Sequence, residues 1–378
     1  MKSFLSFLII LAFFSISVFA EQECDFSIYN NTGTFLIDKS GDTRNINGGV
    51  EVNLKNKQRE FSAKGILGEI PGKIAFTNKS FGFKLNDISY FSGSAAFSYN
   101  FTDNFSAALS LGAASAKTDI SDLYLLFGRL SFPSCGGASL VLSFPYDLFV
   151  NTQYYGADYD FLNEQDNSIG SGKLHLFDIN AGRNWLFTGE GDNGFHKLHT
   201  SAGFMYAYIN GDITVTTNEQ NQIFLPFSYA FGNWDLCAEF VTLNADYNFH
   251  RGAFDVFLNT SVFLNVYSYV RYFFKGTYKK NIFYDGSIVR SEDTFNFSHA
   301  DTFLTLDAKM VYSPVINNSF TLGFTLDKQF VIPLISKASQ REFLHKATSQ
   351  KAFSKDQIKR YAKLALLSGC SVGVSLRF

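Results

Sequence analysis

The sequence predicts an all-β fold, a transmembrane antiparallel up-and-down β-barrel of about fourteen strands. Aromatic residues make up 17% of the 378 residues, while charged residues make up only 17%, below the roughly one quarter of an average soluble domain. Apolar and polar residues alternate over stretches of roughly 11 to 20 residues, longer than most soluble strands. Beyond the amino terminus no apolar run has the length of a spanning helix, and a closed barrel is the other structure that satisfies its backbone in lipid.

The first twenty residues predict a secretory signal peptide. Met1 to Ser3 form a short basic start, residues 4–19 are apolar or small, and Ala20 ends the run. This order is typical of a segment that is cut away, here near Ala20. A membrane anchor is disfavoured because the run is short and no stop-transfer charges flank it. We expect an exported chain with a periplasmic segment at 21–45 and a barrel at 46–378.

Alternation defines the expected strands. The clearest hairpin joins 89–101 to 105–117 through the polar turn at 102–104. The full set is 47–55, 58–67, 89–101, 105–117, 122–132, 138–154, 172–187, 198–216, 222–232, 235–249, 253–273, 300–312, 318–331 and 367–378, with 72–87 as a weaker addition. Twelve strands is the alternative if the first two lie outside the wall. A soluble sandwich is disfavoured because the apolar rows are long and tend to end in aromatic residues, as barrel girdles do.

The carboxyl-terminal strand places Cys370, Val372, Val374, Leu376 and Phe378 on one face and small or polar residues on the other. It resembles the closing strand of bacterial outer-membrane β-barrels, in which a terminal Phe serves as an assembly signal. The resemblance implies the outer membrane of a diderm bacterium. It also implies outer-membrane lipid and the barrel-assembly machinery as partners.

Loop lengths predict the orientation, because periplasmic turns are short and outer loops long. Counting back from a periplasmic Phe378 puts 332–366 and 274–299 outside, and 313–317 and 250–252 in the periplasm. Further back, the count puts the tight turn 102–104 outside and the long stretch 155–171 inside. Either one strand is miscounted or some outer turns are short, and the sequence leaves both readings open.

Charged residues on the polar sides of the strands are candidates for the lumen. By alternation they are Asp246, Arg271, Asp307, Lys309, Asp327 and Arg377. Their mixed signs favour a salt-bridge network that braces the wall over a selectivity filter. The early hairpin has a side of small residues that leaves room for a water channel or an inserted segment; they are Ser92, Ser94, Ser98, Ser106, Ser110 and Gly112.

Segment 335–366 is strongly basic. Its cations are Lys337, Arg341, Lys346, Lys351, Lys355, Lys359, Arg360 and Lys363, set against Glu342 and Asp356, a net charge of +6. Apolar residues recur at helical spacing, so we expect one basic amphipathic helix, or two, in an extracellular loop. Three interpretations stay open: a solvated loop helix, which is favoured, a plug in the lumen, or a helix on an anionic outer surface.

The pattern favours a passive pore for small solutes, hydrophobic ones included. The latter version is similar to long-chain fatty-acid transporters in architecture alone. The alternative is a surface-exposed binding or structural barrel, adhesin-like, with a closed lumen. No enzyme is expected, because the six His residues accompany no nucleophile motif. No cofactor or metal is expected, since the four Cys residues are widely spaced, and a net charge of −2 suggests no nucleic-acid partner.

Overall fold

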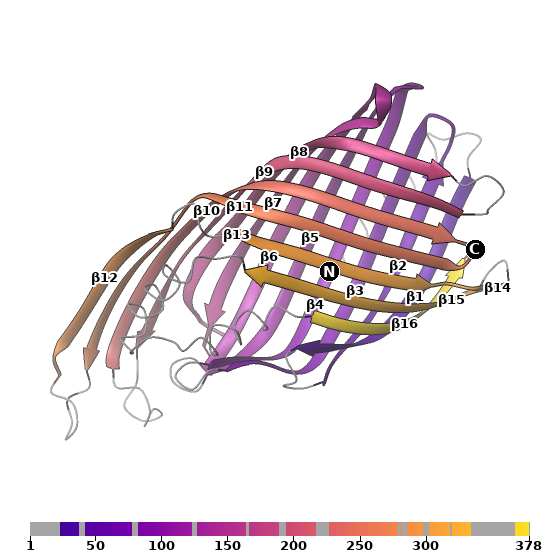
Figure 1. Ribbon diagram of the computed structural model, residues 1–378. Coiled ribbons are helices and arrows are strands. Elements are labelled where there is room, and N and C mark those ends of the chain that lie inside the picture. The colour runs from indigo at the N-terminus through magenta and orange to yellow at the C-terminus, as the bar shows by residue number, and fades with distance from the viewer. Residues whose placement is uncertain are drawn as a thin grey trace.

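The structure is a computed structural model. The residues that it describes are 23–37, 42–77, 82–122, 127–163, 166–188, 194–216, 227–278, 280, 286–297, 302–317, 320–333 and 367–377. The predicted signal peptide and the predicted basic helix lie outside these ranges. Almost all of the described residues belong to strands of one antiparallel sheet (Figure 1). In the described ranges no helix is long and apolar enough to cross a membrane.

The elements are β1 (Glu23–Ile37), β2 (Asp42–Lys55), β3 (Arg59–Thr77), β4 (Gly82–Thr102), β5 (Phe105–Asp122), β6 (Phe127–Phe144), η1 (Pro145–Asp147), β7 (Leu148–Leu162), β8 (Ser168–Thr188), β9 (Gly194–Thr216), β10 (Phe227–Arg251), β11 (Phe254–Tyr278), β12 (Ile288–Phe297), β13 (Thr302–Tyr312), β14 (Val315–Asn317), β15 (Phe320–Pro333) and β16 (Leu367–Arg377). Each strand from β1 to β11 pairs with its successor in the chain.

The sheet returns to its own start. Residues 254–264 of β11 pair with β13, β13 pairs with β15, β15 pairs with β16, and β16 pairs with β1. Fourteen of the described strands therefore form a continuous ring of antiparallel pairs, with β12 and β14 beside it. Figure 1 shows β12 continuing along β11, where it pairs with residues 268–277. The predicted up-and-down barrel is confirmed.

The predicted number of strands is right because two errors cancel. Residues 23–37, expected outside the wall, form β1, which pairs with β2 and with β16. The stretches 222–232 and 235–249 were expected as two strands, but 235–249 and the described part of the first stretch, 227–232, belong to the single strand β10. The expected gap between the two stretches, Asn233 and Trp234, pairs with β9 and with β11. Pairing on both sides continues the strand through the gap.

The strand boundaries near residue 135 are also corrected. The expected strands 122–132 and 138–154 are replaced by β6 and β7, which meet at the short turn η1. Pro133, which cannot donate to a ladder, falls in the expected gap 133–137. It lies within β6, where the register shifts against β5 and β7. A bulge accommodates the missing donor without ending the strand.

Merging two stretches into β10 removes the conflict in orientation. The turns at 103–104, 145–147 and 252–253 all lie at the end of the barrel where β16 finishes, here called the lower end. Leu162 and Ser168, where β7 ends and β8 begins, lie at the opposite, upper end. The miscounted strand, and not a set of short outer turns, caused the conflict.

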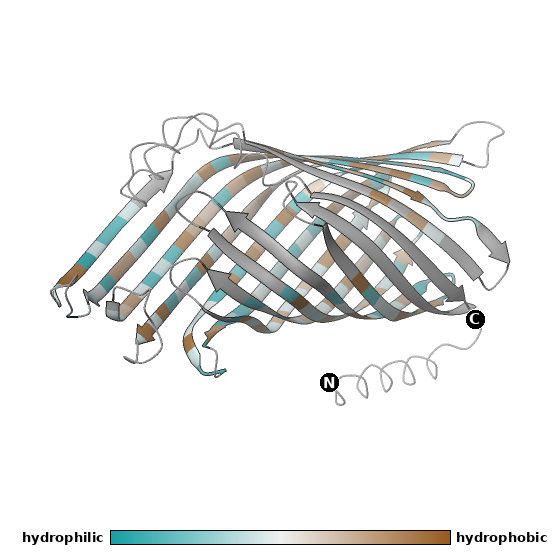
Figure 2. Cartoon of the chain, turned by 90° about the horizontal axis from the view of Figure 1, so that it is seen from below, coloured by the Kyte–Doolittle hydropathy of each residue, from teal (hydrophilic) through white to brown (hydrophobic). Residues whose placement is uncertain are grey.

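The two faces of the wall differ in chemistry. The outer face carries large apolar side chains that are exposed, among them Leu109, Leu111, Val241, Leu243 and Met310. The inner face carries polar side chains that are buried, such as Thr242 and Asn265. Teal and brown alternate along the strands in Figure 2, as expected when successive side chains point to opposite faces. A soluble protein has the reverse arrangement.

Two belts of aromatic side chains bound the outer apolar band. The lower belt contains the ring pairs Phe105–Phe144 and Phe254–Tyr312, with centroids 5.7 and 4.5 Å apart. The upper belt contains Tyr208, whose ring stacks on His175. Along β10, Tyr247 in the lower belt is ten residues from Cys237, the partner of Tyr208. Ten residues of a strand tilted by about 40° span roughly 25 Å, the height of a barrel's apolar band. This is the surface of a membrane-spanning barrel.

Candidate pore wall

The ring is wider than the eight-stranded barrels that are filled by their own side chains. Fourteen strands spaced about 4.8 Å apart and tilted by about 40° give an idealised backbone radius of roughly 14 Å. Barrels of eight strands are filled by their side chains, and those of sixteen or more leave an aqueous channel. The inner wall therefore decides whether this barrel conducts.

One part of the inner wall, on β4 to β6, is lined by small residues. Ser94, Gly112 and Gly137 are directly paired across the three strands. Beside them, the hydroxyls of Ser110 and Ser139 lie 2.6 Å apart. These residues border a hollow of about 400 Å³, hereafter the small-residue hollow. The predicted side of small residues does share this face.

Another part, on β8 to β10, is crossed by hydrogen bonds. Asn180 of β8 lies over Gly203 of β9, and its Oδ1 accepts bonds from Thr242 Oγ1 at 3.3 Å and Asn244 Nδ2 at 3.2 Å, both on β10. Asn244 also donates to Ser201 Oγ at 3.1 Å. A Cβ on residue 203 would collide with Asn180 Oδ1 and with the carbonyl of Ile179. Only glycine lets the amide pass over β9.

Large inward side chains also lie flat against glycines. Tyr90 lies over Gly68, Tyr155 over Gly137, Phe149 over Gly182, and Tyr159 over Gly172 and Gly211. Each glycine pairs with the aromatic residue across the ladder, or with a glycine that does. A ring held in this way runs along the wall and does not project toward the barrel axis. The arrangement keeps the centre of the barrel clear of these bulky side chains.

Tyr159 shows how firmly such a ring is held. Its hydroxyl donates to the carbonyl of Asn210 at 2.8 Å and accepts from Trp234 Nε1 at 3.2 Å. The side chain is only 7% exposed. Four strands, β7 to β10, are joined by this ring and its partners, so the aromatic residue stabilises the wall while occupying little of the lumen.

The structure places three predicted lumen residues on the inner face. Asp246 and Asp307 both pair with Asn259, and Lys309 lies over the ring of Phe257 at 6.0 Å. Two further candidates are placed by their backbones: Asp327 pairs with Lys309, and Arg377 pairs with Ser27. The side chains of Asp327 and Arg377 lie outside the part of the chain that the structure describes.

The prediction for Arg271 is wrong. Between Glu239 and Phe240 of β10 the register shifts, so that Val266 of β11 is an extra residue. The bulge moves Arg271 to the outer face, where its Nη1 lies 4.0 Å from Oδ2 of Asp235. A one-residue bulge exchanges the faces of every residue beyond it. Alternation read from the lower part of β11 therefore fails in its upper part.

The proposed bracing network does not form among the described side chains. None of Asp246, Arg271, Asp307 and Lys309 makes an ion pair with another of the four, and Arg271 pairs with Asp235 instead. The wall is braced by neutral bonds, such as that from Asn265 Nδ2 to Ser268 Oγ at 2.8 Å.

Of four residues with buried acceptors on the inner face, Asp307 was predicted as a lumen candidate and the other three were missed. Four oxygens accept no hydrogen bond from the described residues; they are Oδ1 of Asn151, Asp178, Asn265 and Asp307. Buried polar atoms are nearly always satisfied, by protein or by water. Acceptors of this kind on the inner wall fit a wet lumen. Asn and Asp at inward positions of β7, β8, β11 and β13 are the signal that would have revealed them.

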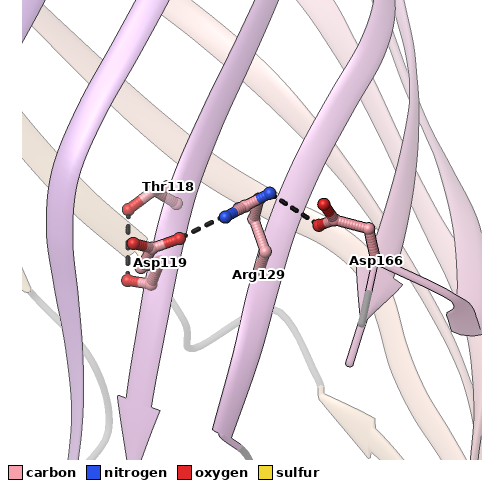
Figure 3. A network of polar contacts seen from close by, with 4 residues as sticks. All are labelled: Thr118, Asp119, Arg129 and Asp166. Atoms are coloured by element: carbon pink, nitrogen blue, oxygen red, sulfur yellow. Dashed lines mark hydrogen bonds and ion pairs between the residues drawn. The ribbon is translucent and has the colours of Figure 1, made fainter. Parts of the chain in front are cut away.

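Above the upper belt the outer face becomes polar. Arg129 of β6 donates to Asp119 at 3.0 Å and to Asp166 at 2.6 Å, which ties Asp166, between β7 and β8, to the wall (Figure 3). Nearby, a hollow of about 720 Å³ is bordered by carboxylates and two cations; they are Asp158, Asp160, Asp212, Asp235, Lys173 and Arg271. Within the described ranges no three His, Cys, Asp or Glu side chains are grouped to hold a metal ion.

No protein-family model matches the chain, and no curated protein sequence matches it either. Among solved structures, it is similar to the translocator domain of autotransporter NalP from Neisseria meningitidis, with 11% identity, a TM-score of 0.37, and coverage of 95% of this chain and 89% of that one. A Pseudomonas aeruginosa FadL homologue gives 10% identity, a TM-score of 0.36 and coverage of 94% and 89%. The CymD monoaromatic hydrocarbon channel gives 12% identity, a TM-score of 0.34, and coverage of 95% of this chain and 88% of that one. With TM-scores this low, none of these proteins lends its function to this chain.

Proposed function

We propose that the chain is an outer-membrane barrel that forms a passive channel for small solutes. The observation that carries the proposal is the inner wall, where bulky side chains lie flat over glycines and β4 to β6 carry small residues. A ring of about 14 Å backbone radius lined in this way keeps an open centre. The buried acceptors of Asn151, Asp178 and Asn265 support a lumen that contains water.

The inner wall also suggests which solutes pass. The polar part at Asn180, Thr242 and Asn244 borders an apolar strip above it on β8 to β10, which contains Leu174, Leu176, Met205, Ile209 and Leu236. Polar acceptors bind hydroxyl or amine donors, while the strip contacts apolar groups. The wall therefore favours small solutes that carry both a hydrogen-bond donor and an apolar group. Hydrophobic solutes remain part of the proposal.

Single-channel recording of the refolded protein in planar bilayers tests the proposal. We expect discrete conductance steps. Gly112→Phe, which puts a ring into the small-residue hollow, lowers the step size, whereas Leu109→Phe on the outer face of the same strand leaves it unchanged. A folded protein that shows no steps in repeated insertions contradicts a pore.

The second candidate is a surface-exposed binding or structural barrel. It is favoured by the height of one side of the wall, where β10 and β11 run for 25 residues and β13 for 11. The polar hollow around Asp158, Lys173 and Arg271 lies on this raised part of the wall. Absence of conductance, together with loss of surface binding when Asp158 and Asp235 are replaced by Asn, favours this candidate.

The location and partners follow the same proposal. Outer-membrane lipid surrounds the apolar band, and the carboxyl-terminal strand β16 contacts the barrel-assembly machinery. Cleavage of the exported chain near Ala20 stays a prediction, to be checked by sequencing the amino terminus of the mature protein. Deletion of Phe378 is expected to lower the amount of folded barrel without blocking export.

A further inference from the structure

A trough runs across the outer face of β6 to β9 just above the lower aromatic belt. Its floor consists of the small residues Ala181, Thr200 and Ala202, and its side is formed by Leu148 and Val150. The volume is about 610 Å³. In the register, Leu148, Arg183 and Thr200 form one row across the three strands, and Val150, Ala181 and Ala202 form the next row above it. We call this feature the lower trough.

A cation lies at the lower end of the lower trough. The guanidinium of Arg183 stacks on the ring of Trp185, 4.1 Å from its centroid. Trp185 Nε1 donates to Thr200 Oγ1 at 3.3 Å, which fixes the indole beneath the arginine. Trp185 pairs with Leu198 of β9, which pairs with Tyr247 of β10, so Trp185 lies at the level of the lower belt. Arg183 is therefore held at the height where lipid headgroups begin.

Arg183 has no anionic partner within the described side chains. No described carboxylate forms an ion pair with it, and its Nε is buried without a hydrogen-bond acceptor. A cation beside lipid is costly unless it is paired or reaches the interface. Guanidinium groups bind phosphate with two parallel hydrogen bonds, and their planar faces remain stacked on aromatic rings. The arrangement is complementary to a phosphate at the membrane interface.

We propose that the lower trough binds one phospholipid. Its phosphate accepts hydrogen bonds from Arg183 at the lower belt, and an acyl chain lies along Ala181 and Ala202 between the taller side chains. The small floor and the fixed cation lie on the same strands, so the site recognises headgroup and chain together. A free phosphate satisfies only the first of these contacts, and a plain hydrocarbon only the second.

Lipid retention on the folded protein tests the proposal. The refolded chain is titrated with phosphatidylglycerol in detergent, and bound lipid is counted by native mass spectrometry. We expect Arg183→Gln to weaken retention of the tightest lipid by roughly tenfold or more, since hydrogen bonds to charged groups are lost. Arg183→Lys retains part of the affinity. Arg271→Gln, which removes an outer-face arginine of the upper end, is the matched control and leaves retention unchanged.

Ala202→Phe fills the trough while Arg183 stays in place, and we expect it to weaken retention as well. Glycerophosphate, which lacks chains, is not expected to compete. If Arg183→Gln binds lipid as the parent does, the arginine only reaches for the interface and the proposal fails. If Ala202→Phe has no effect, or glycerophosphate competes fully, the acyl chain is not in the trough and the proposal fails in that part.

A second measurement does not depend on the stability of these variants. The chain has two tryptophans, so Trp234→Phe leaves Trp185 as the reporter. Phosphatidylglycerol brominated on its chains is expected to quench Trp185 at lower lipid fractions than a brominated diacylglycerol, which has the same chains and no phosphate. Equal quenching by a phosphate-free brominated lipid overturns the proposal, because it shows general contact with the bilayer and no headgroup site.

Discussion

The inner walls of β4–β6 and of β8–β10 solve the same problem in different ways. In the first region the side chains are absent or small, as at Ser94, Gly112 and Gly137, and a hollow results. In the second region a full-sized side chain, Asn180, is laid across Gly203 and bonded to Thr242. The first region is open because its side chains are small, and the second because its larger side chains lie flat against the wall. Glycine therefore has two roles on this wall. In β4–β6 it leaves space, and in β8–β10 it makes room for a side chain that braces the neighbouring strands.

The outer faces of the two regions provide the reference for this comparison. Leu111 on β5 and Leu243 on β10 are both large, apolar and exposed, at 55% and 47%. Both lie between the aromatic belts, in the band that contacts lipid. The outer face therefore makes the same demand on both regions, and the contrast is confined to the inner face.

The largest expected effect tests that reference. Leu111→Arg and Leu243→Arg should each destabilise the barrel by about 2–4 kcal/mol, since an arginine near the middle of the bilayer loses its hydration. Urea unfolding in vesicles, followed by the gel mobility of unheated samples, measures the loss. Ser110→Arg and Thr305→Arg on the inner face are the controls and should cost much less. Equal costs on both faces would show that the assignment of the faces is wrong.

The next effect separates the two roles of glycine. Gly203→Ala should destabilise the barrel by about 1–3 kcal/mol, because its Cβ collides with a backbone carbonyl as well as with Asn180. Gly112→Ala is the matched control, since its Cβ would meet its nearest neighbour, the carbonyl of Gly93, at an ordinary 3.7 Å. The same unfolding assay gives both values. Similar losses for the two variants would mean that the regions do not differ as described.

The bridging amide gives a smaller effect. Asn180→Ala removes the acceptor of Thr242, which is 2% exposed, and should cost about 1–2 kcal/mol because a buried hydroxyl loses its partner. Ser110→Ala also removes one hydrogen bond, to Ser139, but its region borders a hollow that admits water. We expect that control to cost less than about 0.5 kcal/mol. A reversed order of the two losses would count against bridging as the source of rigidity in β8–β10.

Much of the fold followed from the sequence because barrel strands repeat a period of two. The hairpin of β4 and β5 needed only alternation and a polar turn, and the strand β16 needed only alternation. The strand β1 was missed because Asn30, Asn31 and Gly33 interrupt its alternation, and its pairing with β16 is a contact between the two ends of the chain. Long-range pairing of this kind leaves no local signal.

The site was less predictable for a physical reason. Asp246 and Asp307 keep the face that alternation assigns them, because no bulge lies between them and the apolar positions used as reference. Arg271 was misplaced because Val266 adds one residue to the strand, and nothing in the local composition marks it. The flat aromatic rings were missed because each needs a glycine on a neighbouring strand, a coincidence that becomes visible only with the register.

The smallest expected change in stability concerns Tyr155, which connects the two regions. Its ring lies over Gly137 of the small-residue hollow, and its hydroxyl donates to Gln153 Oε1 at 3.2 Å. The side chain is 46% exposed, so Tyr155→Ala should cost no more than about 1 kcal/mol. Removing the ring enlarges the hollow, and single-channel conductance should rise. The expected order of conductance is therefore Tyr155→Ala above the parent, and the parent above Gly112→Phe.

Two controls decide whether the ring acts by its volume. Tyr155→Phe keeps the ring and loses the bond to Gln153, so its conductance should equal that of the parent. Tyr154→Ala changes the adjacent residue, whose side chain points outward to His175, and should also leave conductance unchanged. If Tyr155→Phe raises conductance as much as Tyr155→Ala does, the hydroxyl and not the volume of the ring limits the opening. The hollow of β4–β6 would then be a packing defect of the wall and no part of the path.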